Sequence, residues 1–502
     1  MSDAKQGNPP RRGARLNTVR VASDQDLERR EEQLARQGAA AKSKKKAGRG
    51  ALLLPLQAPP FLAGIPNESS RYAPRQPATK KLKKIIEDNY YRGNFEKAIT
   101  RVAGQNVPEL SDIKTLDQFY FYVDALVTWV PETRVWECRG DILHERTVYL
   151  RIVQFYYYFN QPELEVLQSP ISPVDGQRLS PLSEWLRDFA VEWGSFLDTG
   201  KSTRYLGSFQ YAPEFSWQDY EKAPEEYGSF NEFFGRCFAD IDRLRPVAKP
   251  DDDRTIVFPA ESTFVGRWSI STPVGAPMPA GPSVVVKHIQ WPIQELLADS
   301  EYAEDFAGGM FCHSFLNTYD YHRLHTPVAG RVLEAKFVPG QAYLQVGLKS
   351  TDPEAPPNPD LANAIIPSRY LDADDPTGYQ FVQCRGLLVL DNPNLGKVAV
   401  LPMGMAQVSS VVFTAPGPKH KPIRLSKKER EGKSYAEQVE MLNRKIADQL
   451  VGQELDKGEM FSFFQFGGSD CVVVFERKAN VTVTATRGVH YAIRSQYAVA
   501  NY

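Results

Sequence analysis

Two patterns of hydrophobic and polar positions divide this chain. In residues 181–198, PLSEWLRDFAVEWGSFLD, apolar side chains recur at steps of three and four, the spacing of one face of an α-helix. Residues 115–130 and 145–159 are similarly rich in aromatic residues. These stretches predict buried helices in an accessory region that has no chemistry of its own.

After about residue 250, short β-branched runs alternate with proline and glycine turns, as in CRGLLVLDNPNLGKVAVLPM (384–403). This texture is typical of a β-sandwich or barrel-like domain rather than of βαβ units. No glycine-rich phosphate loop links a strand to a helix, so the sequence gives no support to nucleotide binding. The predicted fold class is therefore α+β, with a helical N-terminal accessory domain followed by a β-rich domain.

The first 50 residues are polar and end in the basic run AKSKKKAGRG. They lack the apolar stretch of a secretory signal, and the acids in SDQDLERREEQ disfavour a mitochondrial presequence. We expect a disordered basic tail over residues 1–80. The expected location is cytoplasmic, with the mitochondrion as the alternative.

Composition narrows the possible partners. Hydrophobic residues make up 42% of the chain and charged residues 24%, and the net charge is −1, so nothing draws the whole chain to nucleic acid. The five cysteines are scattered without a CxxC spacing, which disfavours disulfides and a zinc site and favours a reducing compartment. The nearest apolar run, residues 51–66, contains four prolines and is too short to span a bilayer.

Two short stretches carry candidate chemistry. His322 and His325 lie together in YDYHRLHTPVAG and could form an acid/base pair, or could be polar residues satisfied at a turn. No third ligand is fixed near them, so no metal site is predicted. In FFQFGGSDCVVVFE (463–476), two glycines interrupt a strand, either as a bulge or to let the following hydroxyl turn onto its own backbone.

Five motifs taken in order resemble the phosphatidylserine decarboxylase family. They are YGSFNEFFGRCF (227–238), RLRP (243–246), FPAES (258–262), YHRLHTPVAG (321–330) and FQFGGSD (464–470). The resemblance covers residues 227 to 502. The helical stretch WGSFLDTGKSTRYL (193–206) is similar to a soluble fungal-type branch of the family that includes L-tryptophan decarboxylases.

The resemblance implies a chain that cleaves itself between Gly468 and Ser469. Ser469 would attack the Gly468 carbonyl and become a pyruvoyl group, the covalent cofactor that holds the substrate amine as a Schiff base. His325 matches the family's base for self-cleavage. His322 matches the histidine associated with decarboxylation, as a proton donor.

Two positions depart from the family pattern. The acid that orients the base is usually an aspartate in a PADG-like motif, and here Glu261 follows Pro259 and Ala260. Glu261 would hold the useful tautomer of His325 if its longer side chain reaches the ring. The family's usual LGST motif is replaced here by Gly467-Gly468-Ser469-Asp470. Its first and last residues differ, but the serine nucleophile is retained.

The sequence thus predicts a tail (1–80), a helical accessory domain (81–215) and a pyruvoyl-dependent decarboxylase domain (216–502), with the two cleavage products remaining associated. The predicted substrate is a small molecule, a free L-amino acid, because no spanning helix or strongly basic amphipathic helix is evident in the processed domain. The resemblance to the fungal-type branch implies that this amino acid is aromatic. Phosphatidylserine is the alternative, since residues 51–66 could dock on a membrane. A third alternative is a non-processing scaffold protein.

Overall fold

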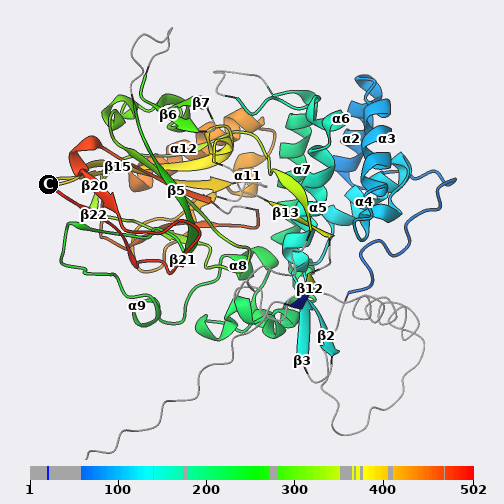
Figure 1. The fold of residues 1–502 in the computed structure, drawn as a ribbon, viewed down its shortest axis with the longest axis horizontal. Coiled ribbons are helices and arrows are strands. Elements are labelled where there is room, and N and C mark those ends of the chain that lie inside the picture. The colour runs from blue at the N-terminus through cyan, green and yellow to red at the C-terminus, as the bar shows by residue number, and fades with distance from the viewer. Residues whose placement is uncertain are drawn as a thin grey trace, which may run out of the picture.

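The computed structural model describes residues 20–21, 58–138, 141–172, 179–271, 281–286, 288–350, 365–366, 369–373, 377–404, 411–467 and 470–502. A helical region comes first and a β-rich region follows, which confirms the predicted fold class. Figure 1 shows the helices, in blue and cyan, to one side of the sheets, in green to red. Among the described residues, no helix is long and apolar enough to cross a membrane.

The helical region is built around an aromatic core. Its helices are α2 (Pro77–Asp88), α3 (Arg92–Ala103), α4 (Leu116–Val127), α5 (Thr147–Phe159), α6 (Pro162–Glu165), α7 (Pro181–Leu197) and α8 (Phe230–Phe234). The three aromatic stretches of the sequence form α4, α5 and α7 as predicted. Phe155 of α5 stacks on Phe189 of α7 with centroids 4.4 Å apart, and both rings are buried. The stripe on α7 therefore serves packing.

Residues 58–76 lie along the helices before α2 begins. The hydroxyl of Tyr72 donates to Asp124 of α4 at 2.8 Å, and the backbone N–H groups of Arg75 and Gln76 donate to the same carboxylate. The prediction of a disordered tail up to residue 80 is wrong for residues 58–80, because these contacts tie them to the core. Most of the preceding tail lies outside the described residues.

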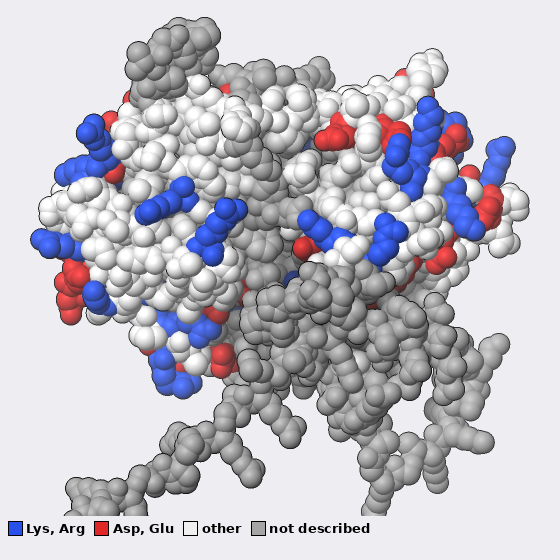
Figure 2. All heavy atoms as spheres, in the orientation of Figure 1, with Lys and Arg blue, Asp and Glu red and all other residues white. Residues whose placement is uncertain are grey.

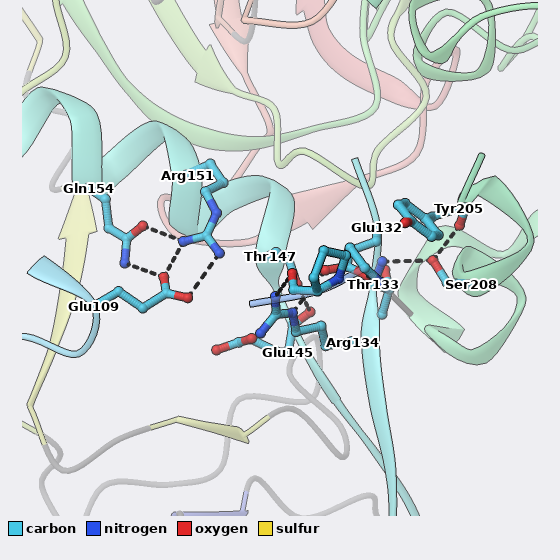
Figure 3. A network of polar contacts seen from close by, with 12 residues as sticks. Glu109, Glu132, Thr133, Arg134, Glu145, Thr147, Arg151, Gln154, Tyr205 and Ser208 are labelled. Atoms are coloured by element: carbon cyan, nitrogen blue, oxygen red, sulfur yellow. Dashed lines mark hydrogen bonds and ion pairs between the residues drawn. The ribbon is translucent and has the colours of Figure 1, made fainter. Parts of the chain in front are cut away.

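A buried polar network fixes the start of residues 58–76, called the strap below, to the helical region (Figure 3). Glu132 and Arg134 form an ion pair of 2.8 Å in which each side chain is 1% exposed. Glu132 also accepts from the N–H of Ala58, and Arg134 donates to the carbonyl of Pro59. Such a pair stabilises only while both partners are present.

The β-rich region centres on an eight-stranded sheet whose neighbouring strands are all antiparallel. In spatial order the strands are β17 (Glu454–Leu455), β10 (Gly330–Val338), β14 (Cys384–Asn392), β15 (Gly396–Gly404), β19 (Asp470–Phe475), β8 (Met310–Phe315), β5 (Ser262–Ser269) and β21 (His490–Tyr491). Strand β19 therefore occupies an interior position.

Both faces of β19 are buried. Cys471, Val473 and Phe475 belong to the main core, while Val472 and Val474 point into a second apolar cluster on the opposite face. A strand covered on both faces reads as a continuous apolar run, which explains the sequence CVVVF.

A second sheet lies beside the first and contains β16 (Val411–Phe413), β18 (Met460–Phe464) and β9 (Arg323–His325), with β18 in the middle. Strands β18 and β19 are consecutive in the chain but belong to different sheets. The connection between them, residues 465–469, therefore crosses from one sheet to the other and contains the predicted cleavage site.

The longest described helix of the β-rich region was not predicted. Helix α12 (Tyr435–Leu450) begins at a capping box of Ser434 and Glu437 and packs on β10. Its Asn443 makes two hydrogen bonds to the backbone of Phe337, at 2.7 and 2.9 Å. Only Ile446 and Leu450 of this helix are buried, so its sequence carries a weak apolar signal.

Charged side chains of both signs are interspersed on the face drawn in Figure 2. On the helical region, lysine and arginine lie next to aspartate and glutamate, and pairs such as Lys81–Asp188 and Arg92–Glu96 are partly exposed. Over the β-rich region, in contrast, lysine and arginine predominate on this face.

Candidate active site

Strand pairing brings the two histidines of the YHRLH motif next to the segment that leads to the predicted cleavage site. Met460 of β18 lies opposite His325 of β9, and Phe463 lies opposite Arg323. The carbonyl oxygen of His322 accepts a hydrogen bond of 2.8 Å from the N–H of Phe464. Residues far apart in the sequence therefore meet at the end of β18.

The ring of His325 is held at both nitrogens. Nδ1 lies 2.7 Å from the carbonyl oxygen of Gly458, and Nε2 lies 3.3 Å from the hydroxyl of Tyr321. Because a carbonyl oxygen only accepts, Nδ1 carries the proton and Nε2 is left as the acceptor. Burial, with a smaller contribution from the charge of Arg494, lowers the pKa of His325 to about 3. The ring is thus neutral, in the tautomer whose Nε2 is a base.

His322 lies in an apolar setting. Its ring stacks on Phe234 of α8 with centroids 3.9 Å apart and meets the edge of Phe464. Burial, and then the nearby charge of Arg236, lower the pKa of His322 to about 3. No well-formed hydrogen bond joins either ring nitrogen to another described residue, although backbone groups of Thr318 and Asn317 lie close enough to oppose part of this lowering of the pKa. One nitrogen of the neutral ring carries an N–H and the other a lone pair.

Glu261 lies near the histidines but is engaged elsewhere. Its carboxylate accepts two hydrogen bonds from Arg245, at 2.7 and 2.9 Å. The segment before Glu261 does contact His325, because the backbone carbonyl of Pro259 accepts a hydrogen bond of 2.8 Å from the backbone N–H of His325. Among the described contacts no bond joins Glu261 to the imidazole. The group that fixes the tautomer of His325 is the Gly458 carbonyl, not the predicted acid.

The helical region holds the crossing segment. The N–H of Phe466 donates to Oδ1 of Asn231 on α8 at 3.1 Å, and the amide of Gln465 donates to Asp198, the C-cap of α7, at 2.6 Å. The ring of Phe466 packs edge-on against Trp193. These helices were predicted only as a packing unit, and their contact with the segment before the cleavage site was not predicted.

Gly467 takes up the turn in that segment. Its φ of +97° is one that residues with a Cβ rarely adopt. Gly468 and Ser469, the predicted cleavage site, lie outside the described residues, and Asp470 resumes the chain as the first residue of β19. The described surroundings fit a group made from residue 469: a neutral imidazole base, a glycine turn and buried flanks on both sides.

Other polar side chains of the site were not singled out from the sequence. Asp320, directly before Tyr321, bonds to His490 at 3.0 Å, and burial raises the pKa of its carboxyl group. Asp320, Tyr321 and Asn231 all lay inside motifs already quoted, so their position was the available signal. No sequence signal could have identified the Gly458 carbonyl, because every residue has a backbone carbonyl. Among the described residues, no group of three or more His, Cys, Asp or Glu is placed to hold a metal ion.

Comparison with known proteins identifies relatives of the β-rich region. A family model described as phosphatidylserine decarboxylase matches residues 230–496. Phosphatidylserine decarboxylase proenzyme 3 of Schizosaccharomyces pombe is 24% identical over 303 residues, which cover 60% of this chain and 24% of that protein. A Fusobacterium nucleatum phosphatidylserine decarboxylase proenzyme is 24% identical over 58% of this chain and 74% of its own length.

This chain is also similar to a protein that is named for a different decarboxylase activity. An L-tryptophan decarboxylase of Psilocybe cyanescens is 26% identical over 249 residues, which cover 48% of this chain and 45% of that protein. The match thus spans about a quarter of the fission yeast protein and less than half of the Psilocybe protein.

Proposed function

This chain belongs to the phosphatidylserine decarboxylase family, and we propose that it is a pyruvoyl-dependent decarboxylase that cleaves itself between Gly468 and Ser469. The observation that carries the proposal is the pairing of β9 with β18, which sets a neutral imidazole base beside the segment that leads to Ser469. A base in the correct tautomer is what an internal serine nucleophile needs.

In the proposed self-cleavage, His325 accepts the hydroxyl proton of Ser469 at Nε2 as the serine oxygen attacks the Gly468 carbonyl. The Gly458 carbonyl keeps the proton on Nδ1 throughout, so Nε2 remains the basic atom. The hydroxyl of Tyr321 is hydrogen-bonded to Nε2 in the structure, and this bond must break before the serine hydroxyl can bind there. Glu261 has no direct part in this proposal, because Arg245 holds its carboxylate.

A pyruvoyl group at residue 469 supplies a carbonyl that binds the substrate amine and withdraws electrons from the bond to the departing carboxylate. His322 is proposed to deliver a proton to the carbon that loses CO₂. The ring is neutral in the described state, so it must first take up a proton, which the substrate's ammonium group releases when its nitrogen bonds to the carbonyl, and it then passes that proton to the carbon. Stacking on Phe234 fixes the plane of the ring.

We propose a free aromatic L-amino acid as the substrate class. The Psilocybe relative, which carries the name L-tryptophan decarboxylase, supports this choice. Phosphatidylserine is the second candidate, because the fission yeast and Fusobacterium relatives carry that name.

Intact mass spectrometry of the purified full chain tests the processing. We expect two chains, 1–468 and 469–502, the second with a pyruvoyl start. Ser469→Ala should remain a single chain. Ser462→Ala is the matched control, because Ser462 is a buried serine of the adjoining strand β18 and should not affect cleavage. A wild-type protein that stays intact would leave only the scaffold alternative.

The substrate is tested on the cleaved protein. We expect CO₂ release from L-tryptophan or another aromatic amino acid without detergent or lipid. Turnover of phosphatidylserine vesicles, together with no turnover of any free amino acid, would select the lipid substrate instead.

A further inference from the structure

The residue that follows Ser469 begins a buried cluster of polar side chains. Oδ2 of Asp470 lies 3.0 Å from Nε2 of His313 on β8, and it also accepts from the Gln380 amide at 3.2 Å and the Tyr379 hydroxyl at 3.4 Å. His313 Nδ1 lies 3.1 Å from the hydroxyl of Thr377. Asp470, His313 and Gln380 have no exposed surface.

The register of the sheet explains how these side chains meet. Asp470 pairs with Phe315, and His313 pairs with Val472, so Asp470 and His313 are diagonal neighbours on one face of the sheet. Val472 on that same face belongs to the second apolar cluster. The polar cluster therefore interrupts a face that is otherwise filled by hydrophobic side chains.

Burying these polar side chains costs desolvation free energy, and packing alone does not explain why they are there. An ion pair buried in a core generally stabilises a fold no better than hydrophobic side chains of the same volume. Here, moreover, Oδ1 of Asp470 is buried and has no hydrogen-bond partner among the described residues. What the cluster does provide is a fixed position for residue 470, directly after the cleavage site.

We propose that His313 and Asp470 are positioning residues for self-cleavage. This inference rests on the proposed function. In the acyl shift, the Ser469 oxygen forms a bond to the Gly468 carbonyl carbon, the bond from that carbon to the Ser469 nitrogen breaks, and the hydroxyl proton ends on that nitrogen. Asn231 holds the chain before this bond through Phe466. The His313–Asp470 pair holds the chain after it, so that serine and carbonyl meet in one geometry.

Two pairs of variants test the proposal during cell-free synthesis of the full chain. Asp470→Asn keeps the size of the side chain but removes its charge. His313→Leu removes the donor, whereas His313→Gln retains an N–H that can still donate to Asp470. Val474→Ala is the matched control, because Val474 lies on the same face of the same strand but is paired with Phe311 rather than with His313. The readouts are the rate at which chain 469–502 appears and the melting temperature of each variant.

We expect Asp470→Asn and His313→Leu to cleave about 10²-fold more slowly, the size of effect that a misplacement of about 1 Å produces. His313→Gln should recover part of the rate, and Val474→Ala should cleave at the wild-type rate despite a lower melting temperature. Hydroxylamine, which cuts an ester, should not split the slow variants, because the acyl shift itself is impaired.

Wild-type rates in Asp470→Asn and His313→Leu would overturn the inference and leave the proposed function intact. Cleavage rates that simply follow melting temperature across all four variants would also overturn it, since the pair would then be only structural. An uncleaved wild-type chain would instead remove the proposed function, and this inference with it.

Discussion

His325 donates from Nδ1 to the backbone carbonyl of Gly458 at 2.7 Å, and this bond determines which nitrogen of the ring is basic. The same carbonyl accepts from Nε of Arg494 at 3.0 Å. The backbone of Gly458, rather than a carboxylate, thus links the histidine to a buried arginine. A carbonyl can hold the tautomer without adding a negative charge that would favour the protonated ring, so burial keeps the ring neutral.

The first prediction separates the two histidines. His325→Ala should accumulate uncut chain, because Ser469 loses its base. His322→Ala should still cut itself but should decarboxylate at least about 10²-fold more slowly, the usual contribution of a positioned proton donor. Cleavage is measured by mass spectrometry and decarboxylation by CO₂ release. Full decarboxylase activity in His322→Ala would refute the role proposed for His322.

Glu261 provides a companion test. Glu261→Gln retains hydrogen bonding to Arg245 and should cut itself at close to the wild-type rate, because the carboxylate is not on His325. Loss of cleavage in Glu261→Gln comparable with that in His325→Ala would restore Glu261 to the orienting role predicted from the sequence.

Periodicity predicted much of the architecture because the relevant side chains are buried in regular patterns. The stripe that includes Phe189 and Trp193 gave α7, and the run Cys471–Phe475 gave a strand that is buried on both faces. Helix α12 was missed because it buries only two side chains. Residues 58–76 were missed because their apolar side chains, Phe61, Leu62, Ile65 and Tyr72, follow no helical or strand period and because hydrogen bonds to Asp124 hold the rest of the segment.

The site was predictable only as far as it is local in sequence. His322 and His325 share one motif, so their proximity needed no fold. Asp470 and His313 lie 157 positions apart, and only the pairing of β19 with β8 joins them. Glu261 was assigned by motif position, but Arg245 competes for its carboxylate, and that competition depends on tertiary structure.

The second prediction concerns acid stability. His322 and His325 have an ordinary pKa of 6.5, and folding lowers both to about 3. Between these values the unfolded chain binds more protons than the folded one, so stability is complete above about pH 6.5 and is lost as the pH falls towards 3. Each histidine contributes a slope of about 1.4 kcal/mol per pH unit in this window.

Urea unfolding between pH 7.5 and 4.5 measures that slope. His322→Gln should flatten it by about 1.4 kcal/mol per pH unit, because one of the two groups is removed. His288→Gln is the control, since His288 is exposed. Equal slopes in wild type and His322→Gln would mean that His322 is not held neutral by the fold.

The third prediction assigns the helical region a part in processing. Asn231→Ala removes the acceptor for the Phe466 N–H and the bonds from Asn231 to Gly194 and Asp198. Cleavage should slow about tenfold, which corresponds to a hydrogen bond contributing about 1.4 kcal/mol. Asn94→Ala is the matched control, because Asn94 makes a similar side-chain bond to the Glu163 carbonyl within the helical region. If both variants cleave at the same rate, Asn231 has no special role.

The fourth prediction concerns the buried pair in Figure 3. Glu132→Gln should destabilise the helical region by about 3 kcal/mol, because the buried Arg134 would lose the carboxylate that is hydrogen-bonded to it. The strap should loosen at Ala58, whose N–H donates to Glu132, and limited proteolysis would detect this. Lys81→Met is the control, since the exposed Lys81–Asp188 pair should contribute less than about 1 kcal/mol. Equal effects of the two variants would contradict this distinction.

The last prediction is that the short chain remains in place after cleavage. Residues 469–502 number 502 − 468 = 34 and include β19, β20 (Val481–Val483), β21 and β22 (Gln496–Ala500). Strand β19 pairs with β15 and β8, β21 pairs with β5, and β22 pairs with β4 (Thr255–Val257). Its core side chains are covered on both faces, so leaving would expose a large apolar area to water.

We therefore expect both chains to elute together from a sizing column in native buffer and to separate only in concentrated urea. Val474→Asp places a charge on a fully buried face of β19 and should prevent stable association. Arg487→Asp, which puts the same side chain on an exposed position of the short chain, should leave association unchanged. Release of the wild-type short chain in native buffer would mean that the pairing across β19 does not hold the cleaved protein together.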